Sequence, residues 1–197
     1  NQAKKIFSPS NPTEEKTKNY PSGGFIPPIS EKPKPSGELP ESLFSDLQNT
    51  AWAIKAINSL AQKGILQGNG DGTFSPDRPV TRDEFVKMIV MTFDVKMSDG
   101  ELNYDDINQN SWSKKFVAAA VNAGIISGID ETHFGSGMNI TRQDAAVIAE
   151  RTMRYKGVEM ESSSLKFDDS YEISDYAVDA VAKMNYCKIM TGLSETV

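Results

Sequence analysis

Apolar residues recur every three or four positions in five stretches of this chain, the spacing that places side chains on one face of an α-helix. In chain order, the five apolar stripes are Ala53, Ala56, Ile57, Leu60 and Ala61; Phe85, Met88, Ile89 and Thr92; Ser113, Phe116, Val117, Ala120 and Val121; Ala145, Ile148, Ala149 and Thr152; and Ala177, Ala180, Val181 and Met184. Segments rich in Gly, Asp and Pro lie between the stripes and indicate loops. The pattern predicts an all-α protein built from helix–loop–helix units.

The helices belong to internal repeats, because the same motifs return at a nearly constant spacing. Three motifs show this: an aromatic-x-Asp motif, a Gly-Ile-Leu-x-Gly motif and a Thr-Arg pair. They begin, with some substitutions, at Phe44, Tyr104 and Phe167; at Gly64, Gly124 and Lys188; and at Thr81 and Thr141. The offset is 60 residues between the first two copies and 63 or 64 between the second and third. A fixed period of this kind predicts one supersecondary unit used three times.

The three repeats span residues 43–102, 103–165 and 166–197, and we expect the third to be incomplete. Its Thr-Arg pair would fall near position 205, beyond Val197. Because no single unit can bury two apolar stripes alone, the repeats are expected to share one core in a pseudo-threefold helical bundle. In the simplest arrangement, the three first helices pack together, and the second helices lie outside and bridge neighbouring repeats.

Residues 1–42 differ sharply in composition from the rest. They hold eight of the ten prolines and eleven charged residues, but few apolar ones. Proline fixes φ and removes a backbone donor, and scarce apolar surface cannot offset the entropy cost of ordering. We therefore predict an extended, semi-rigid Pro-rich linker, which implies a covalently attached cargo domain upstream of it.

Charge and residue counts exclude several classes of function. The chain has 21 Lys and Arg against 27 Asp and Glu, and residues 43–197 carry −7 once the +1 of the linker is removed from the total of −6. This acidity argues against nucleic-acid binding, and no apolar run approaches 18 residues, which argues against membrane insertion. No signal peptide is visible at the start of the chain. The single cysteine, Cys187, excludes an internal disulfide, and the single histidine, His133, leaves little room for a His-based metal site or catalytic triad.

The order of the motifs resembles the S-layer homology (SLH) domain, a family usually found as three tandem copies. In the first copy, aromatic-x-Asp, Trp-Ala, Gly-Ile-Leu-x-Gly, Asp-Gly-Thr-Phe-Ser-Pro and Thr-Arg-Asp-Glu follow one another over residues 44–84. The second copy has Thr-Arg-Gln-Asp, and the third is degenerate. The resemblance implies a module without enzymatic activity or cofactors that anchors exported proteins to the bacterial cell wall, and hence an extracellular, cell-surface location. The implied partner is a secondary cell wall polysaccharide that commonly carries pyruvate ketals, held in grooves between neighbouring repeats with the arginine of the Thr-Arg pair central.

Each Thr-Arg pair begins the second helix of its repeat. Thr81 is a good N-cap, and Glu84 three residues later predicts a capping box. Thr141 with Asp144 is a shorter version of the same signal. This interpretation is purely structural, and it fixes where the arginines that follow must lie.

Arg82 and Arg142 take the first helical position, beside the positive end of the helix dipole, where a cation is mildly unfavourable. The guanidinium, the free backbone N–H groups of the first turn and the positive end of the helix dipole would all favour a carboxylate bound at this point. Both arginines are therefore candidate ligand-binding residues. Because residues 43–197 are acidic, their overall charge does not attract an acidic polymer, which must instead be bound by such local sites. Arg82→Lys is expected to weaken wall binding, because lysine cannot form the two parallel hydrogen bonds of a guanidinium. In the alternative interpretation, the arginine pairs with a nearby acid such as Asp71 or Asp77.

The loops before the Thr-Arg pairs hold further candidate ligand-binding residues. Gly68, Gly70 and Gly128 would let backbone N–H groups approach sugar oxygens, and Asp71 and Asp130 would accept hydrogen bonds from sugar hydroxyls. Turn chemistry explains the same residues and is the favoured interpretation.

The two tryptophans, Trp52 and Trp112, could stack on sugar faces. Each lies at a helix start beside apolar neighbours, so we expect the indoles to pack instead. His133 occupies a variable loop position and is expected to have a surface or turn role. Cys187, beside the end of a helix, is expected to be a small buried apolar residue.

Two other functions fit the sequence less well. A calcium loop around residues 69–73 would need acids where Gln67 and Arg78 stand, so a metal site is not expected. A protein-interaction scaffold that has lost glycan binding is the remaining alternative to wall anchoring. The degenerate third copy and the altered Thr-Arg-Gln-Asp motif favour it slightly.

Overall fold

The computed structural model describes residues 42–192 of the 197-residue chain. Its elements are the 3-10 helix η1 (Gln48–Ala53), α1 (Ile54–Gln62), α2 (Arg82–Thr92), α3 (Lys114–Asn122), α4 (Arg142–Tyr155), the 3-10 helix η2 (Ser170–Glu172) and α5 (Val178–Tyr186). Within this range every named element is helical, and the single β-type pairing is an isolated bridge between Thr81 and Asn139. The predicted all-α, helix–loop–helix organisation is confirmed. The predicted linker lies outside the described residues, apart from Ser42.

The second helices of repeats 1 and 2 begin where the capping signals predict. The Thr81 hydroxyl accepts a hydrogen bond from the Glu84 N–H, and the Glu84 carboxylate accepts one from the Thr81 N–H, which completes the capping box. The Thr141 hydroxyl accepts a hydrogen bond from the Asp144 N–H in the same way. Two donors that a free helix end would leave unpaired are thus satisfied at the start of α2, and one at the start of α4.

The first helices end in a left-handed residue, as the glycines predict. Gly64 follows α1 with φ of +70°, and Gly124 follows α3 with φ of +68°. In repeat 3, Lys188 adopts the same conformation, with φ of +60°. A side chain at such a φ is strained, so the third repeat keeps the backbone turn without the residue that suits it.

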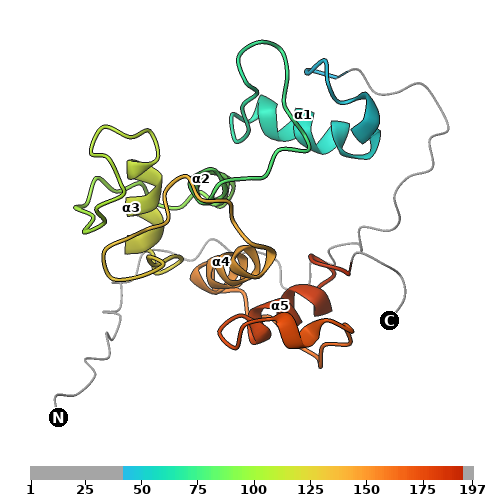
Figure 1. The fold of residues 1–197 in the computed structure, drawn as a ribbon, viewed down its shortest axis with the longest axis vertical. Coiled ribbons are helices and arrows are strands. Elements are labelled where there is room, and N and C mark those ends of the chain that lie inside the picture. Colours follow the sequence, from blue (N-terminus) through green and yellow to red (C-terminus); the bar gives the residue numbers. More distant parts are fainter. Residues whose placement is uncertain (1–41, 193–197) are drawn as a thin grey trace.

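The helices pair across repeat boundaries. Helix α2 packs against α3, α4 packs against α5, and α2 and α4 touch each other in the middle of the molecule (Figure 1). Among the described helices, α1, α3 and α5 make no contact with one another and lie around this central pair. The expectation that the first helices pack together is therefore wrong, whereas the second helices do bridge neighbouring repeats.

Buried apolar side chains form three clusters, which corrects the expectation of one shared core. The largest lies between α2 and α3 and includes Val117 and Phe134, both completely buried. The second lies between α4 and α5 and includes Ala146 and Met184. The third belongs to η1 and α1, around Leu47. A complete structural unit is therefore the second helix of one repeat with the first helix of the next.

The buried face of α2 is wider than the predicted apolar stripe and includes residues outside it. Val86 and Val90 are buried, whereas Phe85 and Met88 are only half-buried and Thr92 is exposed. The helix is contacted by α3 and by α4, so its buried surface extends past a single stripe. None of the helices in the described range combines the length and the apolar character that crossing a membrane requires.

Candidate functional site

The aspartate of the aromatic-x-Asp motif holds the loop of its own repeat. The Asp46 carboxylate accepts backbone N–H groups of residues 74 and 75 at 2.9 and 2.7 Å. Asp106 accepts three from residues 134–136 at 2.7–2.8 Å. The N–H of Ser75, above all, lowers the pKa of Asp46. Burial alone would raise the pKa of Asp106, but its three N–H donors lower it overall.

Close packing and turn geometry account for the loop glycines. A Cβ on Gly68 would lie 2.4 Å from the ring of Phe44, and one on Gly128 would lie 2.6 Å from the ring of Tyr104. Both glycines therefore allow the backbone to rest on the aromatic residue of the same repeat. Gly70 has φ of +88°, which its turn requires.

The loop acids are also built into turns. Asp71 accepts the Thr73 hydroxyl at 2.6 Å and the Thr73 N–H at 2.9 Å, and these hydrogen bonds lower its pKa. Asp130 accepts the N–H groups of Thr132 and His133 at 2.8 and 2.7 Å, and the pKa of Asp130 is lowered in the same way. The exposed His133 ring lies 3.1 Å from that carboxylate, which raises the pKa of the imidazole. The turn interpretation is confirmed for these residues.

Arg82 is enclosed where repeats 1 and 2 meet, a contact we call boundary 1–2. Only 8% of its surface is exposed. Its Nη2 donates to the carbonyl oxygen of Ser127 at 2.9 Å, and its Cζ lies 5.2 Å from the centre of the Phe134 ring. Within the described part of the chain, it forms no ion pair with Asp71, Asp77 or any other acid, and its Nε has no hydrogen-bond partner. Burial lowers the pKa of the guanidinium.

The neighbouring Asp83 joins α2 to the loop of repeat 2. Its carboxylate accepts the hydroxyl of Ser136 at 3.0 Å and the N–H of Gly137 at 2.7 Å, and the side chain is 4% exposed. The backbone N–H of Arg82 donates to the carbonyl of Met138 at 2.8 Å. Side-chain and backbone contacts together fix the start of α2 against repeat 2.

The equivalent contact between repeats 2 and 3, boundary 2–3, is more open. Arg142 is exposed, and its Nη2 donates to the carbonyl of Thr191 at 2.9 Å. Thr191 aligns with Ser127, so each arginine reaches the same backbone position of the following repeat. Gln143 takes the place of the buried aspartate and exchanges two hydrogen bonds with Ser174, at 3.0 and 3.2 Å.

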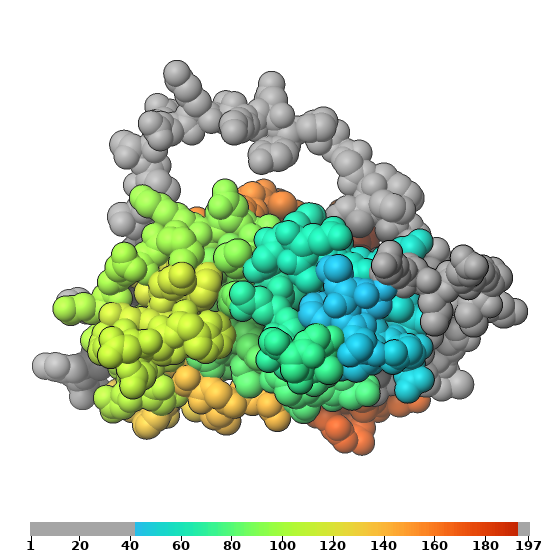
Figure 2. Space-filling view, turned by 90° about the horizontal axis from the view of Figure 1, so that it is seen from above, coloured from blue at the N-terminus to red at the C-terminus, as the bar shows by residue number. Residues whose placement is uncertain are grey.

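A groove of about 700 Å³ runs along boundary 1–2. It lies between the loop of repeat 1, one face of α2 and the start of α3, segments that lie side by side in Figure 2 as teal-to-green and yellow-green surfaces. Its charged and aromatic lining residues are Phe74, Arg78, Glu84, Lys87, Trp112, Lys115 and Phe116. This volume falls within the range of small-molecule sites, about 300–1,000 Å³.

The described lining carries three cations and one acid, a local charge of +2. Arg78 binds Glu84 at 2.7 Å, which raises the pKa of Arg78. Burial would raise the pKa of Glu84, but its contact with Arg78 helps to lower it. Lys87 donates to the side chain of Gln67 at 3.0 Å, and no ion pair among the described residues involves Lys87 or Lys115. Two of the three cations are thus not neutralised.

The indole of Trp112 forms part of the groove wall and is 53% exposed. The Nζ of Lys87 lies 5.9 Å from the centre of its ring, and the Phe116 ring lies 6.4 Å away. Trp52 is 62% exposed. The expectation that both indoles pack is therefore wrong, and so is the burial expected of Cys187, which is exposed.

Among the residues predicted to bind ligand, Gly68 lines this groove. The others belong to the turns and helix starts described above: Thr81, Arg82, Thr141, Arg142, Asp71, Asp130, Gly70 and Gly128. Their role in binding stays a prediction. Sequence reasoning missed Arg78, Lys87 and Lys115. A signal was present, because positions 84, 87, 88 and 91 share one face of α2 and combine charged residues with methionines beside a tryptophan.

Comparison with known proteins identifies the repeats. The S-layer homology domain family matches residues 43–86 and 103–146. The first two repeats are S-layer homology domains. Helix α5 packs on α4 as α3 packs on α2, so the described part of repeat 3 follows the same packing arrangement.

Relatives of this SLH chain include surface proteins and enzymes. It is 32% identical to an endoglucanase of Bacillus sp. (strain KSM-635) over 76% of this chain and 16% of that protein. It is 27% identical to the surface-layer 125 kDa protein of Lysinibacillus sphaericus over 65% of this chain and 10% of that protein. It is 28% identical to a cellulosome-anchoring protein of Acetivibrio thermocellus over 60% of this chain and 27% of that protein. The chain thus spans a small part of these relatives, one of which is named as a surface-layer protein and another as a cellulosome-anchoring protein.

Proposed function

We propose that this SLH chain attaches an exported protein non-covalently to the bacterial cell wall by binding an acidic, pyruvate-bearing wall polysaccharide in the groove at boundary 1–2. The observation that carries the proposal is the lining of that groove. An exposed indole stands among Arg78, Lys87 and Lys115, against the single acid Glu84. This charge of +2 contrasts with −7 for residues 43–197, so an acidic glycan is attracted locally and not by the overall field.

Each feature of the groove suits one feature of the ligand. The flat, half-exposed Trp112 offers an apolar face to a sugar ring. Lys87 and Lys115, which lack acidic partners within the described chain, suit the carboxylate of a pyruvate ketal. In this proposal Arg82 holds α2 against repeat 2 and so keeps the groove in shape, while the exposed Arg142 offers a separate contact.

The proposal assigns anchoring, not catalysis, to these repeats. The relatives carry names of very different kinds, among them an amylopullulanase and a surface-layer protein. The stretch that each shares with this chain covers only 8% and 10% of the relative's own length. A common anchor attached to different cargoes explains that pattern. We propose that the cargo of this protein is likewise joined to it covalently.

The test is co-sedimentation of the 197-residue chain with wall sacculi before and after the secondary polysaccharide is extracted. Binding is expected to be lost on extraction. Trp112→Ala should weaken binding by about 10–30-fold, the usual cost of truncating a central aromatic contact. Trp52→Ala is the matched control, because it removes the equivalent exposed indole from outside the groove lining.

Two outcomes would contradict the proposal. Binding that survives extraction of the polysaccharide would favour the protein-interaction scaffold. Equal losses for the two tryptophan variants would show that the groove is not the binding site.

A further inference from the structure

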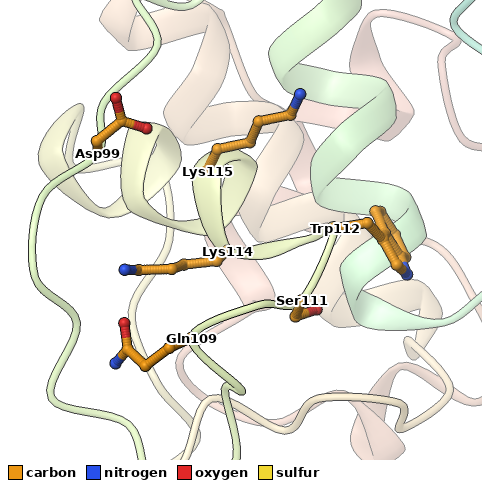
Figure 3. A pocket seen from close by; sticks show the side chains of 6 residues that line it. All are labelled: Asp99, Gln109, Ser111, Trp112, Lys114 and Lys115. Atoms are coloured by element: carbon orange, nitrogen blue, oxygen red, sulfur yellow. The ribbon is translucent and has the colours of Figure 1, made fainter.

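A second depression adjoins the groove. It has a volume of about 320 Å³ and is bounded by the loop that follows α2, by the segment before α3 and by the first turn of α3 (Figure 3). Its lining residues are Asp99, Gln109, Ser111, Trp112, Lys114 and Lys115. Trp112 and Lys115 also line the groove, so the two hollows meet at these side chains.

We propose that the groove and this depression form one track that holds consecutive units of a linear acidic glycan, with Lys114 and Gln109 contacting the unit that lies beyond Trp112. This inference rests on the proposed function and specifies its ligand: an internal stretch of at least two sugar units, not a single terminal unit. Each hollow has a volume typical of a small-ligand site, about 300–1,000 Å³.

The side chains of the depression are placed for this role. Figure 3 shows Lys114 and Gln109 extending side by side, away from Trp112 at the other end. Ser111 lies between this pair and Trp112, in a turn closed by its N–H, which donates to the carbonyl of Asn108 at 2.9 Å. The Ser111 hydroxyl oxygen lies 2.8 Å from that of Ser113 and accepts a hydrogen bond from the Ser113 N–H at 3.2 Å, so its position is constrained. Such prearrangement lowers the entropy cost of binding a polar ligand.

Charge favours an acidic unit in the depression. The described lining holds two lysines, Lys114 and Lys115, and one acid, Asp99. In the described range neither lysine forms an ion pair. Their ammonium groups therefore remain available to a ligand carboxylate, while the carboxylate of Asp99 and the amide of Gln109 suit sugar hydroxyls.

The experiment compares two ligand lengths on the 197-residue chain. The probes are fragments of pyruvylated wall polysaccharide with one repeating unit and with three, titrated by calorimetry. For the unaltered chain, the longer fragment should bind about tenfold more tightly, since one added charge-assisted contact gives a factor of that order. Lys114→Ala and, separately, Gln109→Ala should reduce this advantage and leave the affinity for the one-unit fragment unchanged within about twofold. Lys55→Ala, at the position equivalent to Lys115 in repeat 1 and outside both hollows, is the charge-matched control.

The outcomes separate the two proposals. If the unaltered chain binds both fragments but Lys114→Ala keeps the full length advantage, the track is wrong and the groove proposal stands. If Lys114→Ala weakens both fragments equally, the depression is not a separate subsite and the track is again wrong. If the unaltered chain binds neither fragment, the groove proposal fails and the track fails with it.

Discussion

The two repeat boundaries are built from the same motif but bury it to different degrees. At boundary 1–2, Arg82 and Asp83 are 8% and 4% exposed, beneath Phe134 and the loop that follows it. At boundary 2–3, Arg142 is exposed and Gln143 is only half-buried. Both arginines donate to the same backbone position of the next repeat. The hydrogen bond is thus common to both boundaries. The boundaries differ in whether a loop of the next repeat covers the arginine.

This difference teaches that a repeated motif need not have one role. Where the loop of the next repeat covers it, as over Arg82, the motif fastens two repeats together. No described residue of repeat 3 covers Arg142 as Phe134 covers Arg82. The predictions that follow test this contrast, from the largest expected effect to the smallest.

Removal of the buried carboxylate should show the contrast most strongly. Asp83→Ala leaves the Ser136 hydroxyl and the Gly137 N–H without their acceptor, and should lower the free energy of unfolding by about 2–3 kcal/mol. Gln143→Ala, at the equivalent position, should cost only about 0.5–1 kcal/mol. Urea unfolding followed by circular dichroism measures both. Equal losses would mean that the two boundaries are equally tight.

Arg82→Lys should lower the free energy of unfolding by about 1–2 kcal/mol, because a lysine cannot reproduce both the hydrogen bond to Ser127 and the flat contact with Phe134. Arg142→Lys, on an exposed side chain, should cost less than about 0.5 kcal/mol. Arg82→Lys should also weaken sacculus binding through the shape of the groove. Wall affinity equal to that of the unaltered chain would count against this indirect role.

Acid should loosen the loop that covers boundary 1–2. The pKa of Asp106 is lowered in the folded protein, so its contribution to stability is present above its ordinary pKa and is lost as the pH falls through the folded value. Asp106→Asn should cost about 1 kcal/mol at neutral pH and flatten the decline in stability between about pH 5 and pH 2. Unfolding midpoints across this range measure the effect. An unchanged slope would show that other carboxylates dominate the acid response.

The smallest effect belongs to repeat 3. Lys188→Gly should raise the free energy of unfolding by about 0.5–1 kcal/mol, because glycine adopts φ of +60° without strain. The reciprocal change in repeat 2, Gly124→Ala, should lower it by a similar amount. Thermal unfolding detects both shifts. A loss of stability in Lys188→Gly would indicate that the lysine side chain makes a contribution larger than the strain.

The repeat pattern predicted the local structure well. The capping box at Thr81, the left-handed turns at Gly64 and Gly124 and the turn role of Asp71 all follow from short-range chemistry, which a few neighbouring residues determine. The reason for the aromatic-x-Asp motif was not predicted. Asp46 binds a loop 28 residues away, and periodicity alone does not give that partner.

The pairing of helices could not be predicted from the apolar stripes. An apolar stripe indicates that one face of a helix is buried, but it does not indicate which helix covers that face. In the structure, α3 of repeat 2 packs against α2 of repeat 1. The same limit applies to the groove. Trp112 lies next to buried Ser113 in the sequence, yet its indole is exposed beside Lys87, a residue of another repeat.

The offset between sequence repeats and packed units determines where this chain can be divided. A fragment cut at residues 103 and 165 would separate α3 from α2 and α4 from α5, and would expose two apolar surfaces. A fragment of residues 80–140 would instead keep α2, α3 and Phe134 together. Exchange of repeats between proteins of this family should therefore be made through the loops inside the repeats, which keeps the main helix pairs intact and interrupts the smaller contact between α2 and α4, to which Ile148 contributes.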